Sequence, residues 1–328
     1  MTQSPVPSYL HIFSVPTPFP VGPVNLYLVE GEPLTLLDTG PRYDPAREAL
    51  TEVLAERGYR VTDLQRIILT HAHPDHCGLA AELARASGAE VLAHAATGHR
   101  LAKDGEKERM AFYAKVMRWA GVPMEMLIPL AGARQGASHY TEPLILDRTL
   151  ADGDLLQLGG EEWQVLHTPG HTGDLICLYQ PQRKLLLSSD HLLRHISSNP
   201  VVEQPAPGQS ERPRRLVEYM AQLRRVAEMD VELALPGHGP PITDHRALIR
   251  QRLAFHEERA GRILETIGEE ALSVHEIVGR LFSGLDPINH FLAISEVIGH
   301  LQWLEVEGRA TRREQDGVAC WRITPRQS

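Results

Sequence analysis

The stretch that decides the fold reads Thr70-His71-Ala72-His73-Pro74-Asp75-His76-Cys77-Gly78. It places three imidazoles and one carboxylate within six consecutive residues. The apolar, β-branched residues 66–70 predict a buried strand before it, and residues 78–86 have the composition and apolar spacing of a helix after it. We therefore expect the cluster on a strand-to-helix turn, where its side chains can converge. Neutral imidazole nitrogens and carboxylate oxygens suit a divalent ion such as zinc, and a merely solvated turn is the weaker interpretation.

The composition is that of a globular chain with an acidic balance. The chain has 328 residues, 42% of them hydrophobic, which is room for one large domain and a small one or for two ordinary ones. The formal net charge of −9 argues against a general nucleic-acid or anionic-membrane binder, although it leaves a local basic groove open. The three cysteines, Cys77, Cys177 and Cys320, are far apart and odd in number. With no secretory signal and no bilayer-spanning apolar run, they favour a cytoplasmic protein.

Short strands are predicted before the cluster, at residues 10–15, 24–30 and 34–38, because proline and glycine punctuate apolar runs there. A helix is predicted over 44–57, and a strand over 90–93 follows the cluster. Asp38 closes the third strand in Asp38-Thr39-Gly40. Two roles are open for it: ordinary turn chemistry, or a carboxylate that orients a metal-bound histidine.

Residues 98–147 interrupt the alternation of strands and helices. Helices are expected over 107–120 and 124–133, in sequence rich in methionine, aromatic and charged residues. We interpret this segment as a helical insertion over the site. Ordinary packing explains its apolar residues by default, and a lid that covers the substrate is the functional alternative.

Three further turns each offer one ligand at the end of an apolar strand. Strands are predicted at residues 155–158, 163–167, 175–179, 184–188 and 232–235, with a helix over 212–229. A lone histidine on a Pro-Gly turn is ordinarily a turn residue. The recurrence, together with the 70–78 cluster, predicts one set of metal ligands. The three turns present, in chain order, His171, Asp190 and His238.

The C-terminal part reads as a separate unit. A helix over 244–267 leads from a catalytic domain, residues 1–245, into residues 246–328. Helices over 273–282 and 291–305, then a hairpin of 310–313 with 319–323, follow the order of a winged-helix domain. Residues 269–328 hold six arginines and no lysine against nine acidic residues, whereas DNA-reading modules have the opposite balance. We expect a structural or interaction-making unit. Nucleic-acid contact is the minority alternative, with a local basic group of Arg309, Arg312 and Arg313.

The ligand pattern resembles a known family. His71-Ala72-His73-Pro74-Asp75-His76, followed by His171, Asp190 and His238, looks like the metallo-β-lactamase superfamily in its glyoxalase II-like form. The match in motif order and strand rhythm covers residues 9–245. The resemblance implies an αββα sandwich of two mixed β-sheets with a dinuclear site on one edge. The tail is similar, more weakly, to the winged-helix domain of the β-lactamase-like protein 2 branch.

The resemblance also implies the cofactors and the roles of the ligands. We expect two divalent ions, zinc first, with iron or manganese compatible with the same ligand set. Two close ions can ionise a shared water near neutral pH, so that the bridging hydroxide is the nucleophile, and Asp75 would orient it. The resemblance assigns to the first metal His71, His73 and His171, to the second Asp75, His76 and His238, and to a bridge between them Asp190.

Other polar residues near these turns receive weaker roles. His191 is left out of the ligand set, because adjacent strand residues point to opposite faces. Cys77 is interpreted as a buried small residue rather than a thiolate ligand. Loops at the rim of a site often contact substrate. The candidates for such contacts are His195, Ser197, Ser198 and Asn199.

The sequence thus predicts a metal-dependent hydrolase that acts on an ester, thioester or related carbonyl of a small-molecule substrate. One alternative is a nuclease of the same fold that cleaves RNA or DNA phosphodiesters. Another is an iron-dependent redox enzyme, such as a persulfide dioxygenase or, with a flavin partner, an oxygen reductase, because zinc supplies no redox chemistry. A third is a DNA-binding regulator with a vestigial hydrolase domain. A homodimer is open, and no membrane association is expected.

Overall fold

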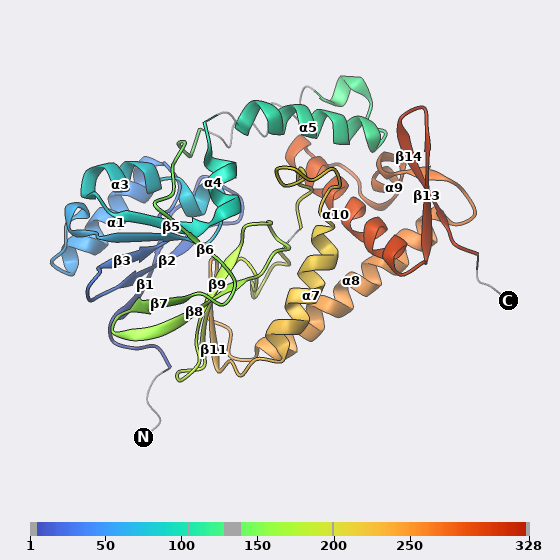
Figure 1. Cartoon of the computed structure of the whole chain (residues 1–328). Coiled ribbons are helices and arrows are strands. Elements are labelled where there is room, and N and C mark those ends of the chain that lie inside the picture. Colours follow the sequence, from blue (N-terminus) through green and yellow to red (C-terminus); the bar gives the residue numbers. More distant parts are fainter. Residues whose placement is uncertain (1–4, 104, 128–138, 199, 326–328) are drawn as a thin grey trace.

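Two β-sheets stacked face to face form the first part of the protein (Figure 1). The computed structural model describes residues 5–103, 105–127, 139–198 and 200–325. The first sheet has six strands, which pair antiparallel from β1 to β3 and parallel from β3 to β6. In sheet order they are β1 (Leu10–Val15), β2 (Val24–Val29), β3 (Thr35–Leu37), β4 (Arg66–Leu69), β5 (Glu90–His94) and β6 (Arg148–Leu150).

The second sheet has five strands in the order β11-β10-β9-β8-β7. Neighbouring strands pair antiparallel, except that β10 and β11 run parallel. Both sheets are therefore mixed, as the family resemblance implied. The strands are β7 (Leu155–Leu158), β8 (Glu161–His167), β9 (Ile176–Gln180), β10 (Leu185–Ser189) and β11 (Leu233–Pro236).

Helices cover the outer face of each sheet. Ile67 of β4 packs in the core between the first sheet and its helices, whereas Ile68 packs in the core between the two sheets. Both faces of β4 are covered, which explains why its sequence is apolar throughout. The order helix, sheet, sheet, helix confirms the predicted αββα sandwich. The covering helices are α1 (Asp44–Glu56) and α3 (Ala80–Ser87) on the first sheet, and α7 (Arg215–Ala227) and α8 (His245–Ile267) on the second; η1 (Val61–Asp63) precedes β4.

The insertion begins with two helices, α4 (Ala95–Leu101) and α5 (Gly105–Trp119), and α5 runs from α4 toward the C-terminal hairpin (Figure 1). The helix expected over 107–120 corresponds to α5. Of the helix expected over 124–133, residues 124–127 are helical and the rest lies outside the described residues. The sequence did not indicate β6, because two of its three residues are exposed and it has no apolar run.

The C-terminal unit has the expected order of helix, helix and hairpin. Its sheet contains a third, two-residue strand, β12, which is too short to leave a sequence signal. The sheet order is β12-β14-β13, all antiparallel. The likeness to a winged-helix domain stays a prediction. The elements are β12 (Leu272–Ser273), α9 (Val274–Leu281), α10 (Pro287–Val306), β13 (Ala310–Gln315) and β14 (Val318–Ile323).

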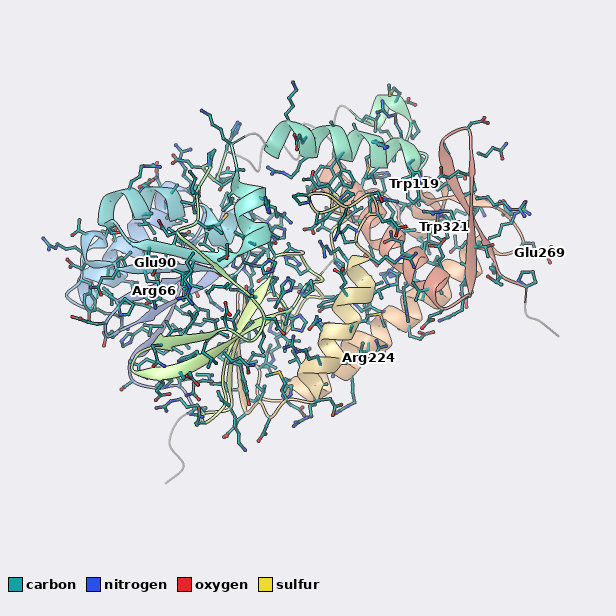
Figure 2. All side chains as sticks on the ribbon, in the orientation of Figure 1. Arg66, Glu90, Trp119, Arg224, Glu269 and Trp321 are labelled. Atoms are coloured by element: carbon teal, nitrogen blue, oxygen red, sulfur yellow. The ribbon has the colours of Figure 1, made fainter. Side chains whose placement is uncertain are left out.

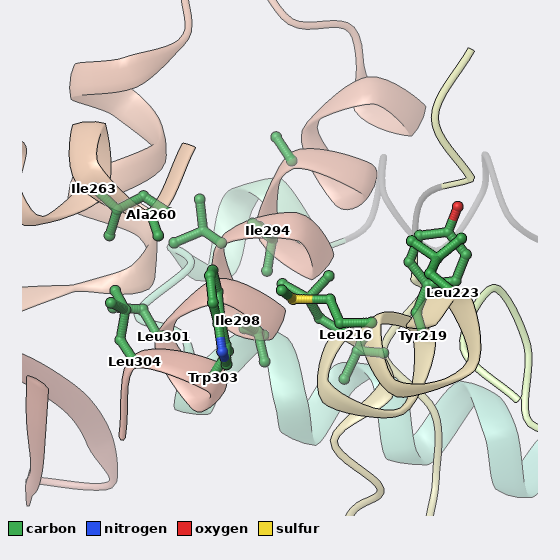
Figure 3. Packing of buried hydrophobic residues seen from close by; sticks show 14 of the residues in the cluster. Leu216, Tyr219, Leu223, Ala260, Ile263, Ile294, Ile298, Leu301, Trp303 and Leu304 are labelled. Carbon is green, nitrogen blue, oxygen red and sulfur yellow. The ribbon is translucent and has the colours of Figure 1, made fainter. Parts of the chain in front are cut away.

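One hydrophobic core joins the C-terminal unit to the second sheet. Leu216 of α7, Ala260 and Ile263 of α8, and Ile298 and Leu301 of α10 belong to the same cluster of buried side chains (Figure 3). Burial of each such leucine or isoleucine contributes about 1.5 to 3 kcal/mol. The C-terminal unit is therefore held against the αββα sandwich by apolar packing, and the domain boundary at residue 245 stays a prediction.

Two helices reach the length of a bilayer-spanning segment: α8 has 23 residues and α10 has 20. Among the helices in the described part of the chain, none combines that length with enough apolar character to cross a membrane.

Candidate metal centre

The histidine-rich stretch lies where the parallel strands β3 and β4 end. After β4, residues 70–73 form a non-helical turn, and α2 (Pro74–Cys77) begins at a proline, a residue favoured at the first helical position. The other predicted ligands follow strands of the second sheet: His171 lies between β8 and β9, Asp190 follows β10, and His238 follows β11. These turns meet at one edge of the sandwich and bring the predicted ligands together.

Three histidines from two turns form the first candidate ligand group. The ligand nitrogens of His71, His73 and His171 lie within 4.8 Å of one another. His171 Nε2 lies 3.0 Å from His73 Nδ1, and the His71 ring is fully buried. This is the set that the resemblance assigns to a first metal ion.

Asp75, His76 and His238 form the second group, again with ligand atoms within 4.8 Å of one another. His238 Nε2 lies 3.3 Å from Asp75 Oδ2. His238 Nδ1 lies 2.8 Å from the carbonyl oxygen of Pro23, to which it donates in the tautomer that leaves Nε2 available for a metal. The same residues are those assigned to a second ion.

The Asp190 carboxylate lies between the two groups. Its Oδ1 is 3.4 Å from His76 Nε2, and its Oδ2 is 3.6 Å from His171 Nε2 and 3.8 Å from His238 Nε2. With His71 and His76 it also forms a third, overlapping group of potential ligands. A carboxylate that bridges two cations requires this placement.

The donor atoms fit a divalent cation. Nε2 of His71, His76 and His238 and Oδ1 of Asp190 are buried and have no hydrogen-bond partner among the described residues. A buried polar atom without a partner costs about 1 to 3 kcal/mol, so their convergence is unfavourable unless a ligand satisfies them. Imidazole nitrogen and carboxylate oxygen are the donors that zinc, iron and manganese accept.

Charge and burial set the protonation of the centre. Burial, followed by repulsion from neighbouring histidines, holds the pKa values of His71 and His73 well below the ordinary value, so both rings are in the neutral form that binds metals. Burial opposes ionisation of Asp190, but the charges of His76 and His238 hold its pKa far below the usual range. Burial likewise lowers the pKa of His76, but Asp190 outweighs this effect and raises it. A cation must therefore displace a proton from His76.

Asp38 makes the contact that the orienting role requires. Its Oδ2 lies 2.7 Å from His76 Nδ1 and accepts a hydrogen bond from Thr70 Oγ1 at 2.8 Å, while its Oδ1 accepts from the Thr70 backbone N–H. Thr70 Oγ1 also lies 3.1 Å from His71 Nδ1. Asp38 is buried, with a φ of 56° that aspartate tolerates better than most residues. One carboxylate thus holds His76 directly and His71 through Thr70.

Asp174 received no role from sequence reasoning. It is fully buried, and its Oδ2 accepts hydrogen bonds from the Ala72 backbone N–H at 2.8 Å and from Thr97 Oγ1 at 2.9 Å. It therefore fixes the backbone between the two histidines of the first group. The available sequence signal for Asp174 was its position, three residues after the predicted ligand His171. Its partners lie 102 and 77 residues away, so no local pattern indicates the contact.

Gly237 makes room for the centre. A methyl group at this position would overlap Oδ1 of Asp190 and would lie 2.7 Å from Cε1 of His76. Its N–H donates to the carbonyl of Ser189 at 2.9 Å, and its own carbonyl accepts from the Asn25 N–H at 2.7 Å. Two turns cross here so closely that only glycine fits.

A pocket of about 200 Å³ opens beside His73 and is walled by the insertion. Three cationic residues of α4, α5 and their connection contribute to its lining: Arg100, Lys103 and Arg109. Arg100 forms an ion pair with Glu203, which lies in the loop between β10 and α7. The insertion therefore borders the candidate metal centre, and its action as a lid stays a prediction. No sequence motif indicated this pocket.

The predicted substrate contacts lie in the loop after Asp190 and differ in their exposure and hydrogen bonding. His195 is exposed. The Ser197 hydroxyl is buried without a hydrogen-bond partner among the described residues. Ser198 is buried and donates its hydroxyl to the Asp190 carbonyl, a contact that holds the loop. Asn199 lies outside the described residues.

Two residues beside the ligands lie outside every candidate group of the described residues. His191 is buried and packs edge-on against Tyr219, with ring centroids 5.6 Å apart. Cys77 is 2% exposed, and burial raises the pKa of its thiol to about 12. Its thiol is therefore protonated, in keeping with the interpretation of Cys77 as a small buried residue.

The fold and the ligand geometry define a metal-binding member of a large hydrolase class. Residues 19–238 match the metallo-beta-lactamase superfamily, and the chain belongs to that superfamily.

Individual relatives agree with this assignment. The chain is 34% identical to "Probable metallo-hydrolase YqjP" of Bacillus subtilis, over 90% of this chain and 92% of that protein. It is 31% identical to "Acyl-coenzyme A thioesterase MBLAC2" of Bos taurus, over 51% of this chain and 57% of that protein. Among solved structures, a metallo-beta-lactamase family protein of Thermus thermophilus has a TM-score of 0.80 and 28% identity, over 96% of this chain and 98% of that one.

Proposed function

We propose that this protein hydrolyses an acyl thioester, or a related ester, of a small molecule with the help of two divalent metal ions. The observation that carries the proposal is the position of Asp190, whose oxygens lie 3.4 to 3.8 Å from ligand nitrogens of both groups. The name of the bovine relative supports a thioester as the substrate. The pocket beside His73 offers the acyl group a place next to the centre.

The proposed ligands are those of the sequence analysis. Two ions held in this way polarise a carbonyl oxygen and lower the pKa of a water molecule, which is the chemistry that hydrolysis near neutral pH requires. We propose zinc, because the set is rich in imidazole and the hydrolysis needs no redox step. The first site would comprise His71, His73 and His171, the second Asp75, His76 and His238, and Asp190 would bridge them.

The chain's own residues orient the reaction. Burial raises the pKa of Asp75, but the charges of His76 and His238 outweigh it and leave the pKa below its usual value. The ionised Asp75 carboxylate accepts a hydrogen bond from the attacking water and directs its lone pair toward the carbonyl carbon. Asp38 and Asp174 keep the donors in place before substrate arrives, so little reorganisation is needed during the reaction.

The proposal extends to the branch of the superfamily, the C-terminal unit and the cellular location. We place the protein in a glyoxalase II-like branch of the superfamily and regard the C-terminal unit as winged-helix-like. Its excess of acidic residues favours packing on the catalytic sandwich over contact with nucleic acid. The three free cysteines of the described residues support a cytoplasmic protein.

The test combines metal analysis with a substrate panel. Protein purified without added metal is analysed for zinc, iron and manganese, then assayed on an acyl thioester, a lactam, a phosphodiester and single-stranded RNA. We expect two zinc ions per chain and turnover of the thioester. Asp190→Ala should lose most activity and metal, whereas Asp44→Ala, at an exposed carboxylate, should not. Iron, RNA cleavage alone, or full activity in Asp190→Ala would contradict the proposal.

A further inference from the structure

A second pocket lies between the insertion and the C-terminal unit. It measures about 490 Å³, and its walls come from four separate segments: α5, the loop before α7, α10 and β13. Trp119 at the end of α5 and Trp321 on β14 lie in this part of the molecule (Figure 2). The pocket exists only because the C-terminal unit packs beside the insertion.

Arg212, in the loop before α7, brings a buried and unsatisfied donor to this pocket. Its guanidinium carbon lies 4.1 Å from the centre of the Trp119 ring. Its Nη1 atom is buried and has no hydrogen-bond partner among the described residues. Burial, followed by repulsion from Arg312, lowers the pKa of Arg212 to about 10, so the group remains a cation at neutral pH. A buried cationic donor without an acceptor is unfavourable unless an anion binds.

The charges around the pocket leave a positive excess. Four cations line it against three carboxylates. Glu305 forms long ion pairs with two of the cations. Its Oε2 lies 3.7 Å from Arg214 Nη2, and its Oε1 lies 4.0 Å from Arg312 Nε. Another carboxylate, Glu314, accepts a hydrogen bond from the Trp119 indole N–H at 2.9 Å. Within the described ranges, Arg212 and the exposed Lys115 have no ion-pair partner, although the whole chain carries a net charge of −9.

One face of α5 contributes residues to the lining of both this pocket and the pocket beside the metal centre. Arg109 and Tyr113 line the pocket beside His73, and Val116 and Trp119 line the second pocket. Their spacing of four, three and three residues places all four on one helix face. At 1.5 Å per residue, Arg109 and Trp119 are about 15 Å apart along the axis. Tyr113 and Val116 are buried in the core between the two pockets, so a ligand that reaches both must pass beside α5 rather than along this face.

We propose that the second pocket binds the phosphate-bearing end of the thioester's carrier, of the kind that coenzyme A provides, while the acyl carbonyl lies at the metal centre. The inference rests on the proposed thioesterase function. Guanidinium groups bind phosphate with two parallel hydrogen bonds, which suits Arg212 and Arg312. The guanidinium carbons of Arg212 and Arg312 lie 4.1 and 5.6 Å from the centre of the Trp119 ring, so two cationic groups meet at one place. The net charge of −9 argues against a nucleic-acid strand as the ligand.

The first experiment measures binding without hydrolysis. Calorimetric titration with the adenosine bisphosphate nucleotide of coenzyme A probes the pocket in the full-length protein. Arg212→Gln and Lys115→Gln should each weaken binding about tenfold, the factor that corresponds to one lost charge-assisted hydrogen bond. Arg118→Gln, at an exposed position of the same helix, is the matched control and should bind like the parent. Equal affinities in the parent and both pocket variants would overturn the proposal.

The second experiment compares two thioesters with the same acyl group, acyl-coenzyme A and acyl-pantetheine, which lacks the phosphates. Arg212→Gln should raise the KM for acyl-coenzyme A about tenfold at unchanged kcat and leave acyl-pantetheine unaffected. Equal losses with both thioesters would overturn the pocket assignment. Nucleotide binding that depends on Arg212, without hydrolysis of either thioester, would support the pocket and refute the proposed function. Arg212-dependent binding of single-stranded RNA without nucleotide binding would replace the proposal with a nucleic-acid surface.

Discussion

Replacement of Asp38 by asparagine isolates the role of one buried carboxylate in the metal centre. Asparagine has the same shape and tolerates the observed φ of 56°, so the backbone should not change. Its amide, however, cannot reproduce the three hydrogen bonds that Asp38 accepts. If the amide NH2 faces His76 Nδ1, the ring proton must move to Nε2, the nitrogen that faces Asp190. If the amide oxygen faces His76 instead, the NH2 takes the place of Oδ1 and opposes the backbone N–H of Thr70.

Either orientation weakens metal binding at the second site. Loss of a residue that orients a metal-bound histidine costs roughly ten- to hundredfold in affinity, or about 1.4 to 2.7 kcal/mol. The first site should change less, because Asp38 reaches His71 only through Thr70. Competition with a zinc chelator, analysed for two sites, measures both affinities. Asp44→Asn, at an exposed carboxylate of α1, is the matched control.

The reasoning would be refuted if Asp38→Asn kept both affinities of the parent and of the control. It would also be refuted if the first site weakened more than the second, because the direct contact is to His76. A thermal unfolding curve close to that of the parent would show that the effect is local to the centre.

Three further outcomes are expected. Gly237→Ala should abolish most activity and lower metal content, because its methyl group would overlap the Asp190 carboxylate. Gly261→Ala, at a half-buried position of α8 where an added methyl group meets open space, should retain both. Chelation of the metal should lower the Tm by several degrees, since an ion present at 100 times its Kd stabilises the folded state by about 2.7 kcal/mol; an unchanged Tm would contradict a metal bound in the core. Burial lowers the pKa of His256 to about 3, so the unfolded chain binds a proton below about pH 6.5 that the folded chain does not. The contribution of His256 to the free energy of unfolding should thus be fully present above pH 6.5 and fall by about 1.4 kcal/mol per pH unit as the pH drops toward 3. Denaturant titrations of His256→Gln should show a shallower decline of the free energy of unfolding with falling pH.

Local patterns in the sequence were sufficient for the strands and for the ligand candidates, whereas the αββα sandwich was implied by the family resemblance. The apolar run before His71 has the composition of a strand buried on both faces, and Ile67 and Ile68 indeed face two different cores. His171, Asp190 and His238 each follow a predicted strand, and parallel or neighbouring strand ends open onto one edge. Short-range rules of strand composition and turn chemistry thus located the site.

The short elements escaped sequence analysis for a physical reason. β12 has two residues and β6 has three, so neither contains a period that distinguishes a strand from a loop. They form strands because a neighbouring edge supplies hydrogen-bond partners, β14 for the first and β5 for the second. Their conformation is therefore decided by tertiary pairing rather than by local preference.

The sequence by itself determined which residues can bind metal, because a cluster of histidines with aspartate at fixed spacing is a local property of the chain. Only the tertiary structure decided what surrounds them. Asp174 meets Ala72 across 102 residues, and Trp119 meets Glu314 across 195. Arg212 becomes an unsatisfied cation only where four distant segments exclude water around it. Burial and long-range pairing depend on the packed fold, and no local pattern encodes them.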